Sequence, residues 1–314
     1  MILIRLAYGV LALWAVSVLV FLATQALPGD AAVTALGRNA TPAGLASFRA
    51  RFDLDAPLIT QYWDWLRHVL SGNLGVSFSM SSSVSAVISS RVVDSLVLMA
   101  VSAVISIPLA VWIGVYTASR RDRLGDHLMS FVVLVINALP EFVMAVAVVV
   151  LLATNVFQIL PAVSALDPND SILGQWRLLV LPVLTLVLMV VPYVARTVRA
   201  CMIEELASEH VRMARLKGLT ERRIILRHAL PNIAGPTFQV VAQSLAYLAG
   251  SIVVIETVFQ YPGVGQALDQ AVSARDIPVI QALACLLAAF YILVNILADI
   301  GTVAMTPTLR KRAR

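Results

Sequence analysis

Long apolar runs alternate with short polar intervals along most of this 314-residue chain. Six runs are close to or above the roughly 20 residues that a helix rising 1.5 Å per residue needs to cross about 30 Å of hydrocarbon. None of them contains Lys or Arg away from its ends. The pattern predicts six membrane-spanning helices, at residues 8–27, 94–118, 129–153, 178–195, 235–259 and 278–304.

The fold class that follows is all-α, a polytopic membrane helix bundle with six transmembrane helices and a small helical outer segment. We expect a retained anchor at the N-terminus, because the first apolar run is longer than an ordinary signal-peptide core. The expected parts are a transmembrane helix at 1–27, an extracytoplasmic helical segment at 28–91, a five-helix core at 92–304 with a cytoplasmic loop at 196–231, and a basic cytoplasmic tail at 305–314.

Two helices are expected in the outer segment. Thr41 is placed to cap the first, with Pro42 at its first helical position, and this helix runs to about Phe52. The second follows Pro57, and its apolar residues at 58, 62, 65 and 66 share one face. It is therefore expected to lie on the membrane or to pack on the spans, and a polar, serine-rich link follows it.

Composition and charge assign a membrane setting and an orientation. The mean hydropathy is +0.87 and only 13% of residues are charged, which is typical of a protein embedded in lipid. With the N-terminus inside, sixteen Arg and Lys residues fall in cytoplasmic segments and seven in outer segments, five of these in the long first one. Because cytoplasmic loops carry the excess of basic residues, both termini are predicted to be cytoplasmic.

The most basic interval is the cytoplasmic loop at 196–231, which carries eight Arg and Lys residues. Ser208 is placed to cap a short helix that ends at Gly218, the residue type best suited to a left-handed C-terminal turn. Thr220 is placed to cap a second helix, which runs to Leu230 before a proline interrupts it.

Charge alone leaves several roles open for this loop. An interfacial amphipathic helix would place its arginines on anionic lipid headgroups. A nucleic-acid-binding helix-turn-helix is sterically poor here, because both ends of the loop are tethered within a few residues of the bilayer. A docking site for another protein is the third role.

The spacing of the loop resembles the EAA loop of ATP-binding cassette importer permeases, which reads EAA, three residues, Gly, nine residues, Ile, one residue, Leu-Pro. Ala214, Gly218 and Leu230-Pro231 occupy matching positions, whereas Arg212 stands at a Glu position and His228 at the Ile position. The run VRMARLKGLTERRIILRHALPN is closer to the version in the dipeptide, oligopeptide and nickel branch, where basic residues and a His before the Leu are usual.

Two further segments resemble the B-type permease subunit of that branch. The segment TPAGLASFRARFDLDAPLITQYWDWLRHVLSGNLGVSF is similar to the outer segment after this subunit's first span, although Asp53 stands where a Gly is usual. The segment GSIVVIETVFQYPGVGQALDQAVSARDIPVIQA is similar to the exit from the fifth span, with Glu256, Pro262 and Gly263 in an outer exit loop. The resemblance covers nearly the whole chain in order.

The resemblance implies one of two permease subunits of an ATP-driven importer in a bacterial plasma membrane. The implied partners are a paralogous second permease subunit, two ATP-binding subunits or one fused chain, an extracytoplasmic substrate-binding protein and membrane lipid, but no nucleic acid. A di- or oligopeptide is the expected substrate, with nickel complexes, haem and glutathione as alternatives. The implied ATPase-coupling residues are Glu209, Arg212, Ala214, Arg215, Lys217, Gly218, Leu219, Arg222, Arg223 and His228.

No catalytic apparatus is evident in the sequence. It lacks a phosphate loop of the form Gly-x-x-x-x-Gly-Lys-Ser/Thr, so ATP and magnesium are expected on the partner ATPases, with no cofactor in this chain. The four histidines and the two cysteines, Cys201 and Cys285, lack the paired spacing of metal ligands, so no metal is expected either.

Polar residues inside the spans are candidates for a translocation path, because an ionisable group in hydrocarbon costs about 2.5–3.5 kcal/mol even on insertion scales. Hydrogen bonding between helices is the alternative role for Asn, Gln and Ser. Glu141 follows Pro140 in an expected helix break, which favours a cavity for this residue. The path candidates are Asn137, Glu141, Gln243, Ser244, Ser251, Asn295 and Asp299.

Two other classes of protein would also form polytopic bundles. A secondary transporter or channel would show matched broken helices in two halves or a ring-forming filter, and neither is evident. A membrane-embedded enzyme would need a nucleophile and a base at membrane depth, which no Ser or His arrangement supplies.

Overall fold

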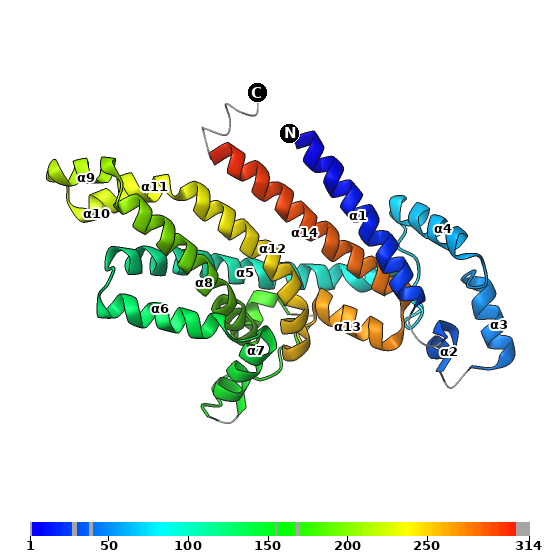
Figure 1. Cartoon of the computed structure of the whole chain (residues 1–314). Coiled ribbons are helices and arrows are strands. Elements are labelled where there is room, and N and C mark those ends of the chain that lie inside the picture. The colour runs from blue at the N-terminus through cyan, green and yellow to red at the C-terminus, as the bar shows by residue number, and fades with distance from the viewer. Residues whose placement is uncertain (1, 27–29, 38–39, 155, 168–169, 306–314) are drawn as a thin grey trace.

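The computed structural model describes residues 2–26, 30–37, 40–154, 156–167 and 170–305, and helices dominate it (Figure 1). A bent pair of shorter helices, α6 (Leu124–Asn137) and α7 (Glu141–Val149), forms a span with a 105° break. The described helices that are long and apolar enough to cross a membrane unbroken are α1 (Ile2–Gln25), α5 (Val84–Ser119), α8 (Trp176–Leu206), α12 (Ala234–Phe259) and α14 (Ile277–Met305).

Contacts between helices define two ends of the bundle. At one end, here called the loop end, Arg5 of α1 forms an ion pair with Asp299 of α14. A Cβ atom on Gly301 of α14 would lie 2.1 Å from the ring of Phe238, so α12 also begins at this end. The start of α1, the end of α14 and the loop between α8 and α12 therefore share one end of the molecule (Figure 1).

The opposite end, here called the far end, contains the end of α12 and the start of α8. The backbone N–H of Ser164, which precedes α8, donates to the carbonyl of Phe259 at 2.8 Å. Since α5 ends at the loop end and α8 begins at the far end, α6 and α7 together carry the chain across. Five of the six expected spans are single helices, and the third corresponds to the bent pair α6 and α7. The predicted end of the first span at Leu27 and the tail at 306–314 lie outside the described residues.

Pro140 accounts for the break in the third span, which the sequence predicts. Proline lacks the backbone N–H that a continuous helix needs, and it disfavours helical geometry in the residue before it. α6 ends at Asn137, Pro140 occupies the N-cap of α7 with extended backbone, and Glu141 opens the new helix. A π-helical turn at Val150–Thr154 ends this second half.

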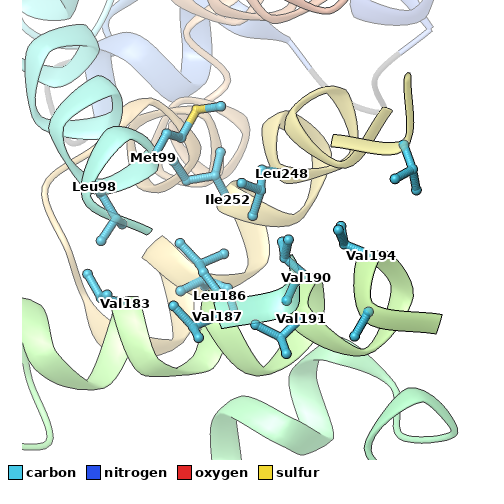
Figure 2. Close-up of a cluster of buried hydrophobic side chains, with 14 of the residues drawn as sticks. Leu98, Met99, Val183, Leu186, Val187, Val190, Val191, Val194, Leu248 and Ile252 are labelled. Carbon is cyan, nitrogen blue, oxygen red and sulfur yellow. The ribbon is translucent and has the colours of Figure 1, made fainter. Parts of the chain in front are cut away.

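The main hydrophobic core lies where α5, α8 and α12 meet. Figure 2 shows Leu98 and Met99 of α5 and Leu248 and Ile252 of α12 gathered around one face of α8. That face of α8 repeats every three to four residues, as helical periodicity requires, and consists of Val183, Leu186, Val187, Val190, Val191 and Val194. α8 is consequently the most enclosed of the spans, and it leads directly into the basic loop.

The outer segment forms short helices at the far end, α2 (Ala31–Leu36), α3 (Pro42–Arg51) and α4 (Leu58–Leu70). Thr41 caps α3 by accepting a hydrogen bond from the backbone N–H of Gly44 at 3.1 Å, which confirms the predicted start. The α4 helix packs on a span as predicted. Its Tyr62 meets the ring of Phe21 edge to face, and the Tyr62 and Ser17 hydroxyls lie 2.9 Å apart.

Asp276 ties the serine-rich link to the core. It lies between α13 (Val264–Ala274) and α14 and is only 1% exposed. Its carboxylate accepts hydrogen bonds from the hydroxyls of Ser77 and Ser79 and from the backbone N–H groups of Phe78 and Ser79, the latter two at 3.0 and 3.1 Å. The contacts hold the link directly before α5, which begins at Val84, ten residues earlier than its apolar run predicts.

Candidate functional site

The basic loop at the loop end is a folded unit with its own small core. It contains α9 (Glu209–Leu216), α10 (Glu221–Ile224), a π-helical turn at Ile225–Ala229 and α11 (Leu230–Asn232). Val211, Ala214 and Ile224 are buried against one another, and Leu206 and Leu219 pack beside them. Gly218 has a φ of +77°, so it supplies the left-handed turn that the sequence predicts.

Two details of the predicted loop are wrong. Ser208 and Thr220 occupy the N-cap positions, but neither side chain accepts a hydrogen bond from a helix N–H. The Ser208 hydroxyl instead donates to the carbonyl of Glu205 at 2.6 Å, which links α9 to the end of α8. The second helix is not continuous to Leu230, because the π-helical turn divides it, and Pro231 lies in the first turn of α11, where its missing N–H costs nothing.

Arg215 holds the loop together from within. Its Nε donates to Oε1 of Glu221 at 2.7 Å, and a second nitrogen reaches Oε2 at 3.3 Å. A third nitrogen donates to the carbonyl of Leu206 at 3.2 Å. The hydrogen bonds with Glu221 raise the pKa of the Arg215 guanidinium further above its ordinary value. Arg215 therefore joins α9, α10 and the end of α8.

A second set of polar contacts closes the base of the loop. Nε2 of His210 lies 2.8 Å from Oε1 of Glu205, at the end of α8. The side-chain amide of Asn232, in α11, donates to the same oxygen at 2.7 Å. Glu205 at the end of α8 thus holds both the first helix of the loop, through His210, and its last helix, through Asn232.

The surface of α9 carries charge around an apolar pair. Met213 is 53% exposed and Leu216 is 76% exposed, one helical turn apart. Exposed apolar side chains of this size on a polar helix are typical of an interaction surface. The predicted coupling residues separate into two groups. Ala214 and Leu219 build the interior of the loop, and His228 is half-buried. Arg215 is exposed but bonded within the loop. The other exposed positions are Glu209, Arg212, Lys217, Gly218, Arg222 and Arg223.

A cavity of about 550 Å³ opens between α6, α8, α12 and α14. Three tyrosines contribute to its wall, Tyr193, Tyr247 and Tyr291, each between 42% and 51% exposed. The Tyr193 hydroxyl donates to the side-chain carbonyl of Gln243 at 3.3 Å. The cavity is lined by Asn137, Met189, Val190, Tyr193, Gln243, Ser244, Ala246, Tyr247, Gly250 and Tyr291.

Glu141 lies at the margin of this cavity, beside the helix break. One of its carboxylate oxygens, Oε1, accepts hydrogen bonds from the hydroxyls of Tyr247 and Ser251, the second at 2.7 Å. The structure thus brings together five of the seven predicted path residues, namely Asn137, Glu141, Gln243, Ser244 and Ser251. Sequence reasoning missed the tyrosines, although Gln243, Tyr247 and Ser251 recur every four residues on one face of α12.

The remaining path candidates lie elsewhere. The Asn295 side chain donates to the carbonyl of Tyr291 in its own helix at 2.8 Å. Asp299 pairs with Arg5 at the loop end. Neither residue is part of the cavity wall, since Asn295 is bonded within its own helix and Asp299 is paired with α1.

Glu256 binds the exit turn at the far end. It is fully buried, and it accepts hydrogen bonds from the Ser95 hydroxyl at 2.5 Å and from the backbone N–H of Gly265 at 2.6 Å. A Cβ atom on Gly263 would lie 2.0 Å from the Glu256 carboxylate, so only glycine fits there. Pro262 precedes this glycine in the turn between α12 and α13. The contacts fix α5, α12 and the exit turn to one another.

A buried ion pair between α6 and α8 is a further feature that the sequence does not reveal. Asp126 is 1% exposed, and its two carboxylate oxygens accept hydrogen bonds from Arg199 at 2.9 and 2.8 Å. The two residues are 73 positions apart in the sequence, so no local spacing marks them as partners. The pair connects the first half of the bent span to the helix that enters the loop.

The apolar spans, the folded loop and the polar cavity between helices define a polytopic helical membrane protein. Residues 107–311 match the family of binding-protein-dependent transport system inner membrane components, and residues 1–99 match the N-terminal part of such membrane components. The chain belongs to this family. It is a permease subunit of an ATP-binding cassette importer and a multi-pass inner-membrane protein, not an enzyme, and the resemblance found in the sequence is confirmed.

Similar proteins align over almost the whole chain. A putative peptide transport system permease protein of Brucella abortus is 33% identical over 310 residues, 99% of this chain and 98% of that protein. A probable peptide ABC transporter permease protein of Sinorhizobium fredii is 30% identical over 306 residues, 98% and 97% of the two chains. A glutathione transport system permease protein of Salmonella typhimurium is 33% identical over 295 residues, 94% of each chain.

Proposed function

We propose that this chain forms half of the translocation path of an importer for di- or oligopeptides and receives the ATPase stroke through its 208–231 loop. The relatives named for peptide and glutathione transport support a peptidic substrate. The proposed partners are a paralogous second permease subunit, two ATP-binding subunits or one fused chain, and an extracytoplasmic substrate-binding protein. ATP and magnesium belong to the ATP-binding subunits, and this chain binds no cofactor.

The observation that carries the coupling proposal is the construction of the loop. A lever must be rigid, attached to the elements that it moves, and able to bind the part that drives it. The small core and the Arg215 contacts supply rigidity, and Glu205, His210 and Asn232 supply attachment. Met213 and Leu216 supply an apolar anchor, and the surrounding cations suit an acidic socket.

The proposed orientation places the loop end in the cytoplasm, with both termini. Arg5 at the start of α1 and the basic loop lie at the same end of the bundle, which agrees with the excess of positive charge on the cytoplasmic side of membrane proteins. The far end, with α2–α4 and the exit turn, then faces the substrate-binding protein.

The cavity wall supports the path proposal. Three tyrosines and the amides of Asn137 and Gln243 lie together between spans, on a face that is partly exposed in the single chain. Polar side chains are costly in hydrocarbon, so this face is suited to a watery passage shared with the second permease subunit.

The coupling proposal is tested with the double variant Met213→Ser, Leu216→Ser. Burying each of these side chains in a socket stabilises the complex by about 1.5–3 kcal/mol, so their loss weakens ATPase binding by roughly a hundredfold or more. We expect the detergent-extracted variant to lose its ATP-binding subunit on co-purification and peptide uptake to stop. The matched control is Leu226→Ser, an apolar side chain of 52% exposure outside α9. Unchanged co-purification and uptake in the double variant would refute the proposal.

A further inference from the structure

We propose that Glu141 is the ammonium-binding group of the translocation path, where it binds the terminal amino group of a passing peptide. This inference rests on the peptide substrate proposed above. It adds the residue, the chemical group that this residue recognises, and the orientation of the peptide in the cavity.

Only one of the two carboxylate oxygens of Glu141 is satisfied within the chain. Oε1 accepts both hydroxyl hydrogen bonds, from Tyr247 and Ser251, whereas Oε2 has no hydrogen-bond partner in the described part of the chain. No Lys, Arg or His among the described residues lies within 4.0 Å of the carboxylate. Glu141 as a whole is half-buried rather than sealed in the single chain.

Linking two helices does not by itself require a charge at this position. A neutral amide oxygen would accept the same two hydroxyl hydrogen bonds between α7 and α12, without the cost of placing an ionised group among spans. The fully buried acidic side chains of the described residues have partners on both carboxylate oxygens. Asp126 binds Arg199, Asp276 binds two hydroxyls and two backbone N–H groups, and Glu256 binds the Ser95 hydroxyl and the Gly265 N–H. Glu141 therefore differs from them in having an oxygen left for an outside cation.

The cavity next to Glu141 suits the rest of a small peptide. Its volume of about 550 Å³ lies within the roughly 300–1,000 Å³ typical of small-molecule sites. The described lining contains hydroxyl and amide groups, which can pair with peptide N–H and C=O groups, but no Lys, Arg, Asp or Glu. A zwitterionic peptide thus finds an attractive charge for its amino end only, at Glu141, and this fixes the direction in which it lies.

The test uses the whole transporter complex, with Cys201→Ser, Cys285→Ser and Gly250→Cys in this chain. A Cβ atom at position 250 has no neighbour within 4 Å, so the reporter thiol fits in the cavity wall without strain. The rate of its modification by a small maleimide is measured in the presence of alanyl-alanine and of N-acetyl-alanyl-alanine. We expect alanyl-alanine to protect the thiol at concentrations about tenfold lower or more, since a hydrogen bond to a charged group contributes roughly 1.5–3 kcal/mol.

Two variants separate charge from architecture. Glu141→Gln keeps an acceptor for Tyr247 and Ser251 but loses the charge, and we expect it to bind both peptides equally weakly. Glu141→Asp keeps the charge and should restore part of the preference. A third probe, N-acetyl-alanyl-lysine, carries its ammonium on the side chain, and weak protection by it assigns the site to the terminal amino group.

Each failure has a separate meaning. Equal protection by the free and the acetylated peptide, or an unchanged preference in Glu141→Gln, overturns the role of Glu141. Protection by N-acetyl-alanyl-lysine equal to that by alanyl-alanine overturns the assignment to the terminal amino group. ATP-driven uptake of alanyl-alanine is measured in parallel with the binding protein present. If the complex transports the dipeptide but shows either failure, only this inference is refuted. If the complex transports no peptide, the proposed substrate is refuted, and the inference with it.

Discussion

At the scale of single residues, most buried charge in this protein joins one helix to another. Asp126 and Arg199 connect α6 to α8, Glu256 connects α12 to α5 and the exit turn, and Asp276 holds the link to the outer segment. Each is paired or hydrogen-bonded on more than one side, as a buried charge must be. Exposed charges that can meet other molecules include Arg212 on α9 and Arg222 and Arg223 on α10.

The Asp126–Arg199 pair should be essential for stability. Asp126→Asn leaves the Arg199 guanidinium, which is 31% exposed, without its charged partner, and we expect a cost on the order of 1–3 kcal/mol, between the values for exposed and buried pairs. We expect a lower melting temperature of the detergent-purified complex, followed by a fluorescent thiol or tryptophan probe. The control is Asp122→Asn, whose carboxylate is 78% exposed and lies 3.5 Å from Arg121, and its melting temperature should not change. Equal melting temperatures for both variants would contradict a structural role for the buried pair.

The sequence could not distinguish between basic residues of the loop. Arg212 and Arg215 are three positions apart and both are exposed. The polar and apolar pattern of the sequence therefore assigns both of them to the same surface. The structure shows that Arg215 is bonded to Glu221, on the other side of the turn at Gly218, and to the carbonyl of Leu206. Arg215 and Glu221 are six positions apart, which is not a helical spacing, so only the turn geometry brings them together.

At the scale of helices, apolar periodicity predicts which segments span the membrane but not where they stop or how they cross. Five of the six predicted runs form single helices long enough to span, and Pro140 marked the break in the third. The size of the 105° bend depends on how α7 packs against α12 and α8, which local sequence does not encode. α5 similarly continues for ten residues beyond its apolar run, because Val84 and Ile88 are buried by α13 and α14.

The crossing of α5 and α8 requires a glycine at position 114. A Cβ atom there would lie 2.7 Å from Cβ of Val198 and 2.8 Å from the carbonyl oxygen of Ala195, and a backbone atom cannot move aside cheaply. We expect Gly114→Ala to separate these helices and to cost about 1–3 kcal/mol, measured as reduced thermal stability and lower yield of intact complex. Gly250→Ala is the matched control, since its Cβ atom would have no neighbour within 4 Å. A fully stable Gly114→Ala complex would show that the two helices pack less closely than described.

At the scale of the whole molecule, the chain is organised between two ends that carry different tasks. The loop end gathers the first residues of α1, the last of α14 and the clamped loop, and the far end gathers α2–α4 and the exit turn (Figure 1). α8 and α12 join them, since both are attached to the loop at one end and line the cavity along their length. A displacement of the loop therefore reaches the wall of the cavity through continuous helices.

This two-ended arrangement predicts opposite accessibility for two exposed positions. Ser71 lies in the turn after α4 at the far end, and Thr220 lies in the loop between α9 and α10. Each is changed to Cys in a background of Cys201→Ser and Cys285→Ser. A membrane-impermeant maleimide is then applied to spheroplasts, whose outer membrane is opened and whose inner membrane is intact. We expect Ser71→Cys to react at once and Thr220→Cys to react only after the membrane is opened, because the proposed orientation puts the basic loop end in the cytoplasm. The reverse pattern would invert the proposed orientation while keeping the architecture. Between the two positions lie α5, the bent pair α6 and α7, and α8, which make three crossings if the bent pair crosses the membrane once. Reaction of both thiols from the same side would therefore show that the bent pair does not make a single crossing.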